Sequence, residues 1–312
     1  MNTTPQKISV LLPVMNEEDN ILPLVERLVP VLESVTEDYE IIFVDDGSKD
    51  NTAEKILTAR KSNTKIVLIK LSRNFGQHFA AQAAFDYCHG DRIVWMDADL
   101  QEPPEAIISL LNKMDEGYDV VYGVRKSLGG PFFKRMGSLL YIYVFNKLVK
   151  HPQPMNASVM RILNRKCVEA INMMPERVRF ITALNSWVGF KWAGVEIDYH
   201  VRRSGKTKYN FSKRINNALD AILSFTMIPL KFISIVGFFI SLLSIAFSLC
   251  ILLAFITKIW TAGVVGWTTI VVSLFFLGGV QMMCLGLIGE YIGRIYFEVK
   301  ARPLYIIDSI TD

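Results

Sequence analysis

Apolar positions along roughly the first 200 residues follow two different spacings. Short runs rich in Ile, Val, Leu and Phe indicate strands at 7–12, 40–44, 65–71, 91–96 and 118–124. Apolar residues three or four positions apart, such as Ile21, Leu24, Leu28 and Leu32, indicate helices, which we expect at 18–34, 51–62, 77–88 and 103–113. Strands that alternate with helices predict an α/β open sheet built from βα units.

The last third of the chain has a different pattern. No residue is charged between Lys231 and Lys258, or between Lys258 and Glu290. Each interval exceeds the ~20 residues that cross a bilayer core, so we predict two transmembrane helices with cores at 232–256 and 267–288. The alternative is a pair of buried helices in a large soluble core, which is disfavoured because such helices seldom run so far without a polar residue facing water.

Basic residues lie on both sides of this predicted hairpin, with Lys258 alone between the two spans. Loops rich in Lys and Arg stay on the cytoplasmic side of a membrane, so we expect both flanks to be cytoplasmic. The N-terminus has no signal-peptide pattern, and we expect nothing there to export the first domain. The flanking basic residues are Arg202, Arg203, Lys206, Lys208, Lys213, Arg214 and Lys231 before the first span, and Arg294, Lys300 and Arg302 after the second.

Two further stretches combine basic ends with apolar and aromatic residues, at about 131–150 and at 212–231. This composition is typical of helices that lie in the membrane interface, although a helix packed on the sheet remains the alternative. The expected organisation is therefore a cytoplasmic α/β domain at 1–211, a juxtamembrane amphipathic helix at 212–231, a transmembrane hairpin at 232–289 and a cytoplasmic tail at 290–312.

Composition agrees with a domain joined to a membrane anchor. The chain is 51% hydrophobic with a mean hydropathy of +0.29, too apolar for an ordinary soluble domain, while 21% charged residues exclude a fully embedded bundle. A net charge of +4 gives no argument for a nucleic acid partner. The four cysteines lie far apart, with no spacing suited to zinc or a redox pair.

Acidic residues follow several predicted strands. Asp45 and Asp46 follow the second, and Asp97 and Asp99 follow the fourth, with Gln101 close behind. Ligands of open α/β sheets bind at these strand ends. No dinucleotide or P-loop glycine motif is present, so a bound diphosphate needs a metal to meet its charge. Two carboxylates and one amide oxygen suit a partly hydrated Mg²⁺ or Mn²⁺.

Six segments in order resemble family 2 glycosyltransferases of the polyprenyl-phosphate type, and the resemblance covers nearly the whole chain. That group includes bacterial bactoprenol (undecaprenyl-phosphate) glucosyltransferases, dolichyl-phosphate mannose synthase and the undecaprenyl-phosphate aminoarabinose transferase. The segments are Pro13-Val14-Met15-Asn16-Glu17, Val44-Asp45-Asp46-Gly47-Ser48, Ser72-Arg73-Asn74-Phe75-Gly76, Asp97-Ala98-Asp99-Leu100-Gln101-Glu102-Pro103-Pro104, Trp187-Val188-Gly189-Phe190 and Leu287-Ile288-Gly289-Glu290-Tyr291-Ile292-Gly293-Arg294.

The resemblance implies a GT-A fold, a Rossmann-like open sheet, that transfers a sugar from a UDP-sugar to undecaprenyl phosphate at the cytoplasmic face of a bacterial inner membrane. It also implies the roles of individual residues. Pro13, Asn16 and Glu17 would line the nucleoside pocket, and Asp45 or Asp46 would accept a hydrogen bond from the base. Arg73 would support the base or the diphosphate. Asp97, Asp99 and Gln101 would hold the metal, and Asp97 and Asp99 would be the catalytic pair.

The acceptor side depends on basic residues. We expect Arg125, Arg135, Arg203 and Lys208 to bind the lipid phosphate, because Arg offers a bidentate fork for phosphate oxygens. Relatives carry an Arg-x-x-Gly-x-[Ser/Thr]-Lys-[Tyr/Phe] segment, which here ends at Tyr209. The alternative is that any one of these residues serves only the positive-inside bias.

One position departs from the pattern of the relatives. They usually have Gly-Asp-Phe-Arg where this chain has Ser158-Val159-Met160-Arg161, so Val159 replaces an acid often regarded as a base. A phosphate monoester is mostly dianionic at pH 7, since its second pKa is about 6, and such a nucleophile needs little proton abstraction. The substitution would reshape the sugar pocket, so the resemblance does not fix which sugar is transferred.

Our main hypothesis is an inverting transfer of glucose, in a pathway of O-antigen or other envelope glycan modification. Transfer of GlcNAc, mannose or an aminoarabinose derivative is the alternative. A processive synthase is disfavoured because two spans are few for a polymer channel and because the Gln-x-x-Arg-Trp motif expected of such synthases is absent. A non-catalytic scaffold is disfavoured because the acidic motif is intact. The resemblance further implies a downstream flippase and glycosyltransferase. Gly278, Gly279, Gly286 and Gly289 would permit a homo-oligomer.

Overall fold

The chain divides into two compact units, Met1–Ala218 with Arg302–Asp312, and Leu219–Ala301. The computed structural model describes residues 6–125, 154, 156–174, 176, 188–199, 230, 233, 235–240, 242–243, 246, 253, 257 and 266–312. The predicted interfacial stretch at 131–150 lies outside these residues, and so do nearly all of 212–231 and most of the first predicted span at 232–256.

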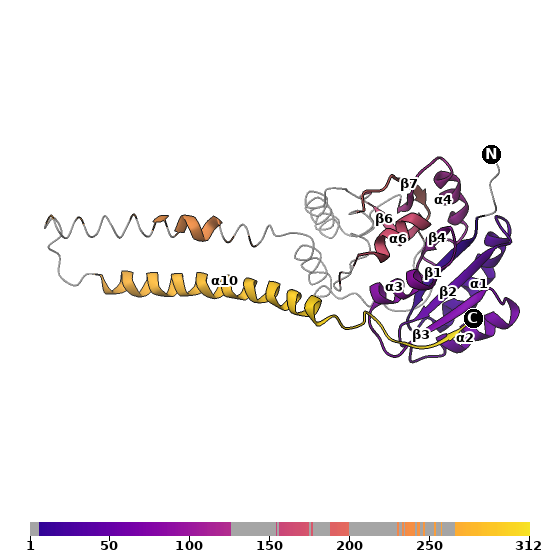
Figure 1. Cartoon of the computed structure of the whole chain (residues 1–312), viewed down its shortest axis with the longest axis horizontal. Coiled ribbons are helices and arrows are strands. Elements are labelled where there is room, and N and C mark those ends of the chain that lie inside the picture. The colour runs from indigo at the N-terminus through magenta and orange to yellow at the C-terminus, as the bar shows by residue number, and fades with distance from the viewer. Residues whose placement is uncertain are drawn as a thin grey trace. The chain divides into compact units, whose positions relative to one another are not determined.

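The first unit is built on a twisted sheet with the strand order β7-β5-β6-β4-β1-β2-β3-β8 (Figure 1). β4, β1, β2 and β3 are parallel neighbours, and β5 is parallel to β7. β6 is antiparallel to β4 and β5, and β8 is antiparallel to β3. The strands are β1 (Ile8–Val14), β2 (Tyr39–Asp45), β3 (Ile66–Leu71), β4 (Arg92–Trp95), β5 (Val120–Arg125), β6 (Ala157–Asn164), β7 (Trp192–Ile197) and β8 (Ile307–Thr311).

Helices cover both faces of the sheet. They are α1 (Glu18–Glu33), α2 (Thr52–Ser62), α3 (Gln77–Tyr87), α4 (Ala106–Met114) and α6 (Arg165–Asn172). α1, α2 and α4 share one hydrophobic cluster, and α3 and α6 share the other. The four helices predicted from apolar spacing are therefore present, and α4 begins three residues late because Pro103 and Pro104 form a turn whose carbonyls accept from Ala106 and Ile107.

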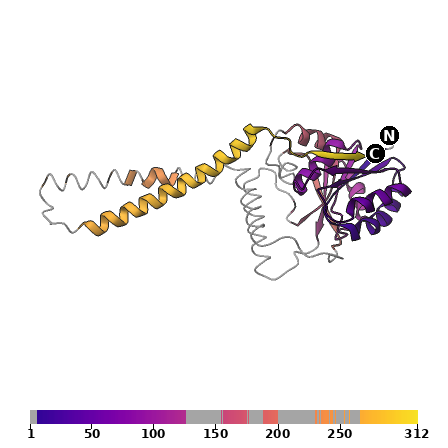
Figure 2. The same cartoon turned by 90° about the horizontal axis from the view of Figure 1, so that it is seen from below.

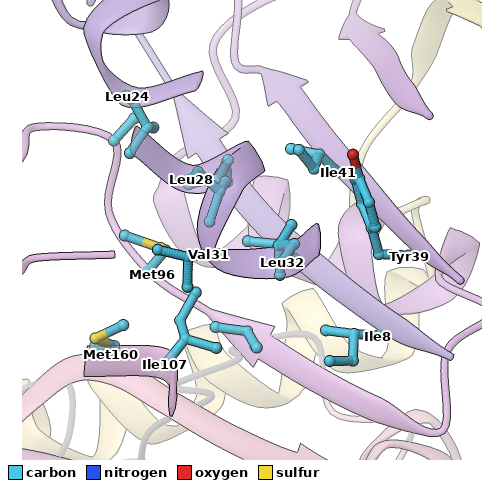
Figure 3. Packing of buried hydrophobic residues seen from close by; sticks show 14 of the residues in the cluster. Ile8, Leu24, Leu28, Val31, Leu32, Tyr39, Ile41, Met96, Ile107 and Met160 are labelled. Atoms are coloured by element: carbon cyan, nitrogen blue, oxygen red, sulfur yellow. The ribbon is translucent and has the colours of Figure 1, made fainter. Parts of the chain in front are cut away.

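Successive side chains of β1 point to opposite faces of the sheet, so this one strand contributes to both hydrophobic clusters. Val10 and Leu12 pack in the cluster with α1, while Leu11 packs in the cluster with α3, and all three are fully buried. Figure 3 shows Leu28 and Leu32 of α1 pointing toward the strands below them. Each such side chain contributes about 1.5–3 kcal/mol when fully buried, so this interface fixes α1 on the sheet.

Three sheet strands, β6, β7 and β8, were not predicted from the sequence. β6 carries Arg161 in its centre, which breaks the apolar run expected of a buried strand. β8 is five residues long with three exposed positions, so its apolar signal is weak and its pairing with β3 determines its structure. The predicted sheet of βα units is confirmed for β1 to β5, and the antiparallel β6 and β8 and the parallel edge strand β7 are additions to it.

The described part of the second unit is dominated by α10 (Trp267–Lys300), which contains the second predicted span. Among the described residues, one stretch, Phe276–Lys300, has the length and mean hydropathy, 1.3, needed to cross a membrane. The charged pair Glu290 and Arg294, 3.0 Å apart, lies inside that stretch. The span predicted at 267–288 shares residues 276–288 with this stretch and stays a prediction.

The tail predicted at 290–312 differs in the structure. α10 continues to Lys300. A helix of 34 residues, which rises about 1.5 Å per residue, is longer than the ~30 Å hydrocarbon core of a bilayer. Ala301 ends the helix with a left-handed φ of 49°. The remaining residues, 302–312, belong to the first unit, and β8 within them is a strand of its sheet (Figure 2).

Candidate active site

The parallel strands β1, β2, β3 and β4 end at one edge of the sheet, and the predicted polar motifs meet there. The backbone N–H of Asp46 donates to Val14 O at 2.9 Å, which joins the turns after β1 and β2. Asn16 N donates to Ser48 Oγ at 2.9 Å, and Lys49 N donates to Asn16 Oδ1 at 2.8 Å. Segments more than 30 residues apart thus form one site.

The turn after β1 is held in an uncommon backbone conformation. Asn16 has a φ of 51°, a left-handed value that Asn tolerates better than most residues. Pro13 is buried within β1. Glu17 lies at the start of α1, where its carboxylate accepts from Asn20 Nδ2 at 2.6 Å and its N–H donates to Thr52 Oγ1 at 2.8 Å. Glu17 therefore has a structural role at this helix start.

Asp45 and Asp46 are both buried but differ in their partners. Asp46 accepts from the backbone N–H of Phe75 at 2.7 Å and of Gly76 at 2.9 Å. Burial raises the pKa of Asp46, with the charge of Asp45 adding to the effect, while the two N–H donors oppose it. Asp45 Oδ1 accepts from Ser48 N at 2.9 Å, whereas its Oδ2 is buried and has no hydrogen bond among the described residues. A buried acceptor left unpaired is costly, which points to a ligand donor.

The loop after β3 packs closely on the turn after β2. Gly47 has a φ of 73°, and a Cβ there would lie 2.7 Å from Arg73 C and Asn74 N, so only glycine fits. The Arg73 guanidinium stacks over the Phe75 ring at 4.2 Å. Its side chain is exposed at the edge of the site, beside Asp46. The loop therefore presents a cation next to the two carboxylates.

The acidic motif follows β4. Asp97 Oδ1 accepts from Gln77 Nε2 at 2.7 Å, and the buried Asp99 accepts from Gln101 N at 3.1 Å. Leu100, which lies between Asp99 and Gln101, has a left-handed φ of 58°. Gln101 Oε1 contacts Tyr199 Oη at 2.6 Å, so the amide predicted to be a ligand is in a hydrogen bond.

These residues fit a divalent cation only as a sparse ligand set. Among the described residues, no group of three or more His, Cys, Asp or Glu side chains could hold a metal ion by itself. Two carboxylates at one strand end suit Mg²⁺ or Mn²⁺, which take most remaining ligands from water and substrate phosphate. The backbone strain at Leu100 is typical of a segment whose geometry the surrounding fold imposes.

Arg125, at the end of β5, lies beside the acidic motif. Its guanidinium stacks over the Tyr199 ring at 3.9 Å, and its Nη2 lies 3.9 Å from the carboxylate of Glu102. Glu102 is buried and accepts from Met160 N at 2.9 Å. Burial raises the pKa of Glu102, and the nearby Asp99 adds to this, although Ser158 and Arg125 oppose it. The other predicted phosphate ligands, Arg135, Arg203 and Lys208, lie outside the described residues.

Arg161 is a site residue that sequence reasoning missed. It is fully buried between the rings of Trp95 and Tyr122, 4.9 and 5.1 Å from the two centroids, and it donates to the carbonyls of Val159 and Ser158. Burial lowers its pKa, and the charge of Asp97 opposes this. A lone Arg within a motif gives no signal of burial, so only the pairing of β6 with β4 and β5 could reveal it.

Arg161 also influences its neighbour on α3. Burial and the positive charge of Arg161 lower the pKa of His78 to about 4, so this imidazole is neutral at pH 7. Val159 is partly buried and packs against the cluster around α3 and α6. The position where relatives carry an acid is therefore part of the apolar packing in this chain.

Comparison with known proteins identifies the family of the chain. The profile of the family described as Glycosyl transferase family 2 matches residues 9–171. A glycosyltransferase of Synechocystis sp., named sll0501 and described as uncharacterized, is 43% identical over 305 residues, which cover 97% of this chain and 95% of that protein. The undecaprenyl-phosphate 4-deoxy-4-formamido-L-arabinose transferase of Photorhabdus laumondii is 36% identical, with coverage of 98% and 94%.

Among solved structures, the chain is similar to glucosyl-3-phosphoglycerate synthase from Mycobacterium tuberculosis in complex with Mn²⁺ and uridine-diphosphate-glucose. That match has 18% identity and a TM-score of 0.49, and it covers 70% of this chain and 77% of the other. The family match and the full-length relatives decide the assignment: the chain is a glycosyltransferase that belongs to glycosyl transferase family 2.

Proposed function

We propose that the protein transfers a hexose, glucose in our main hypothesis, from a UDP-sugar to undecaprenyl phosphate at the cytoplasmic face of the membrane. The observation that carries this proposal is the group of carboxylates at one sheet edge, where Asp97 and Asp99 follow β4 and Asp45 has a buried oxygen that accepts no hydrogen bond from the described part of the chain. Full-length relatives named as undecaprenyl-phosphate transferases support the choice of acceptor.

On the donor side, Asp45 accepts the N–H of the uracil base through Oδ2, because Asp46 is already occupied by Phe75 and Gly76. Arg73 is exposed beside Asp46 and would support the diphosphate. Asp97 and Asp99, with Gln101, would hold Mg²⁺ or Mn²⁺. When bound, the ion supplies charge neutralisation for the departing diphosphate.

On the acceptor side, Arg125 holds the lipid phosphate, and Tyr199 fixes the plane of its guanidinium. A phosphate oxygen forms a bond to the anomeric carbon while the bond from that carbon to the UDP oxygen breaks, which inverts the anomeric centre. The phosphate arrives as a dianion, so no proton has to be removed by the enzyme. Val159 in place of an acid is consistent with this mechanism.

The path of the chain supports a membrane hairpin. The chain leaves the first unit after Ala218 and rejoins it at Arg302, and β8 pairs with β3 in the catalytic sheet. A segment that starts and ends in one cytoplasmic unit crosses the membrane an even number of times. If α10 is one crossing, a second must precede it, as the apolar stretch at 232–256 predicts.

A second candidate donor carries a 4-deoxy-4-formamido-L-arabinose group, because relatives named for that sugar cover almost the whole chain. In either reaction the product is a lipid-linked sugar on the cytoplasmic face, which a flippase and a second glycosyltransferase would have to use. The glycines of α10, Gly278, Gly279, Gly286 and Gly289, would allow helices of a homo-oligomer to approach closely.

A donor screen tests the proposal. Membranes that contain the protein are incubated with a short-chain polyprenyl phosphate, Mn²⁺ and each of several radiolabelled nucleotide sugars, and membranes with the Asp99→Asn variant are the control. We expect one UDP-sugar to give a chloroform-soluble product that mild acid hydrolyses. Transfer from no donor would support a non-catalytic scaffold, and a polymeric product would support a processive synthase.

A further inference from the structure

The C-terminal segment of the chain closes one edge of the catalytic sheet. β8 is antiparallel to β3, with Ile69 opposite Ile310 and Lys70 opposite Ser309. Figures 1 and 2 both show this strand, in yellow, alongside the N-terminal part of the sheet. An edge strand of only five residues is held mainly by this ladder. Its position therefore depends on β3, and β3 in turn gains a partner on its outer side.

Hydrogen bonds join the residues before β8 to the segments that follow β3. Ser72 N donates to Ile306 O at 2.9 Å, directly beyond the last residue of β3. Tyr305 Oη donates to Asp86 Oδ2 at 2.7 Å, near the end of α3. The side chains of Tyr305 and Ile307 also pack against the hydrophobic cluster of α3 and α6. The segment thus contacts both ends of the stretch from 72 to 86.

That stretch contains the donor-side contacts of the candidate site. Ser72 begins the loop that carries Arg73, and the N–H groups of Phe75 and Gly76 donate to Asp46. Gln77, the first residue of α3, donates to Asp97. The contacts of the C-terminal segment described above run to this loop and to α3, so its effect on the donor passes through these two segments.

We propose that residues 305–312 are a positioning element for the nucleotide site, because they hold the 72–77 loop and α3 in the arrangement that presents Arg73 and orients Asp97. The proposal rests on the proposed function for the identity of the ligand, a UDP-sugar. A loop with a fixed start and a fixed following helix has fewer conformations to lose when a ligand binds. Without the segment, the site still contains every donor-side residue but holds them less well.

The experiment uses variants of the full chain in detergent. One variant ends after Ile306 and so lacks β8, a second is Tyr305→Phe, and a third combines both changes. Asp308→Ala is the matched control, because Asp308 lies on β8 with an exposed side chain and the ladder itself is unchanged. The dissociation constant of UDP in the presence of Mn²⁺ is measured by calorimetry. Backbone hydrogen exchange is measured for 72–79 and, as a reference, for α4 at 106–114.

We expect UDP to bind the single variants more weakly and the double variant weaker still, by about 5- to 150-fold, the usual range for coupling between separate sites. Exchange should rise at 72–79 and stay unchanged at 106–114, which packs in the other cluster. The Asp308→Ala protein should match the wild type in both measurements.

Unchanged UDP affinity together with unchanged exchange at 72–79 would overturn the proposal. So would a rise in exchange at both 72–79 and 106–114, since that result means that the segment serves only general stability. If the wild-type chain binds no UDP, the proposed donor is wrong. The hydrogen exchange at 72–79 then tests the positioning role by itself. Failure of the proposed donor and failure of the positioning proposal therefore give different results.

Discussion

Gln77, the first residue of α3, donates a 2.7 Å hydrogen bond to the carboxylate of Asp97, which follows β4. A helix on one face of the sheet therefore fixes the orientation of an acid at the sheet edge. Asp99, two residues later, is held by the N–H of Gln101 at 3.1 Å. Carboxylates whose orientation is fixed before a ligand arrives lose little freedom when they bind it, which is the condition for a well-organised metal site.

The first prediction concerns this pair. Asp99→Asn keeps an acceptor for the N–H of Gln101 but removes the charge, and transfer should fall at least ~100-fold, since a metal contributes several kcal/mol and each 1.36 kcal/mol is a factor of ten. Steady-state rates against Mn²⁺ concentration measure the effect. Asp115→Asn, which removes a surface partner of Arg92, is the control and should keep normal rates. Full activity of Asp99→Asn in EDTA would disprove the metal assignment.

The second prediction separates Asp45 from Asp46. Asp45→Asn keeps the acceptor for Ser48 N and replaces a buried, unpaired oxygen by an N–H donor group. The KM for the donor should rise about 10- to 100-fold, because a hydrogen bond to a charged group contributes ~1.5–3 kcal/mol. Unfolding without ligand should occur at the same temperature or higher, since a buried unpaired charge is removed.

Asp46→Asn should behave in the opposite way. Both oxygens of Asp46 accept backbone N–H groups, so one of these bonds must be lost in the variant, and the protein should unfold at a lower temperature. Thermal unfolding and donor KM of the two variants, measured side by side, test the difference. Equal loss of stability in both would mean that Asp45 is also structural.

The third prediction concerns stability at acid pH. Glu40 is buried at the other end of β2, where it accepts from Ser9 Oγ at 2.5 Å and His89 N at 2.6 Å and pairs with Lys7 at 3.0 Å. Burial by itself raises the pKa of Glu40, but these partners outweigh burial and the pKa is lowered. A lowered pKa adds stability above the ordinary Glu value, and this contribution disappears as the pH falls through the folded-state pKa.

The free energy of unfolding should therefore decrease as the pH falls from about 5, near the ordinary Glu range, toward 3. Glu40→Gln should cost about 1–3 kcal/mol at pH 7 and should show a weaker pH dependence in this window. Denaturant unfolding of both proteins between pH 7 and 3 makes the comparison. A variant with the same pH profile as the wild type would show that another carboxyl is responsible.

Sequence patterns predicted β1 to β5 and α1 to α4 because these elements are defined locally, by apolar spacing within ten to fifteen residues. The meeting of the motifs at one edge was predictable too, since parallel strands end on the same side. Contacts between residues far apart in the sequence were not predictable. Tyr199 reaches Gln101 across 98 residues, and Arg161 is buried only because β6 lies between β4 and β5. No local spacing encodes such pairs.

The fourth prediction concerns topology. From the Lys/Arg bias and the pairing of β8 with β3, we expect residues 258–266 to lie outside the cytoplasm. In a variant whose native cysteines are replaced, a cysteine introduced at Thr261 should react with an impermeant maleimide added to intact cells expressing the protein. A cysteine introduced at exposed Lys61 in α2 should react only after the cells are opened. The reverse labelling would invert the arrangement.

The last prediction distinguishes a phosphate acceptor from a hydroxyl acceptor. Arg125→Gln should raise the KM for polyprenyl phosphate about 10- to 100-fold, because a charge-assisted bond is lost, with little change in the KM for the donor. Arg27→Gln is the control, since Arg27 pairs with Glu105 on the surface. The ratio of the two KM values in each variant is the measurement. Equal effects on donor and acceptor would contradict the placement of Arg125.

The pH dependence of the same reaction tests whether a base is needed. If the nucleophile is a phosphate dianion, the rate should fall about tenfold per pH unit below the phosphate's second pKa near 6. Val159→Asp should then give only a small gain, because the acid would be placed against the apolar cluster of α3 and α6 without having a proton to remove. A variant faster by several orders of magnitude would show that the missing acid limits the wild-type enzyme and that the acceptor needs deprotonation.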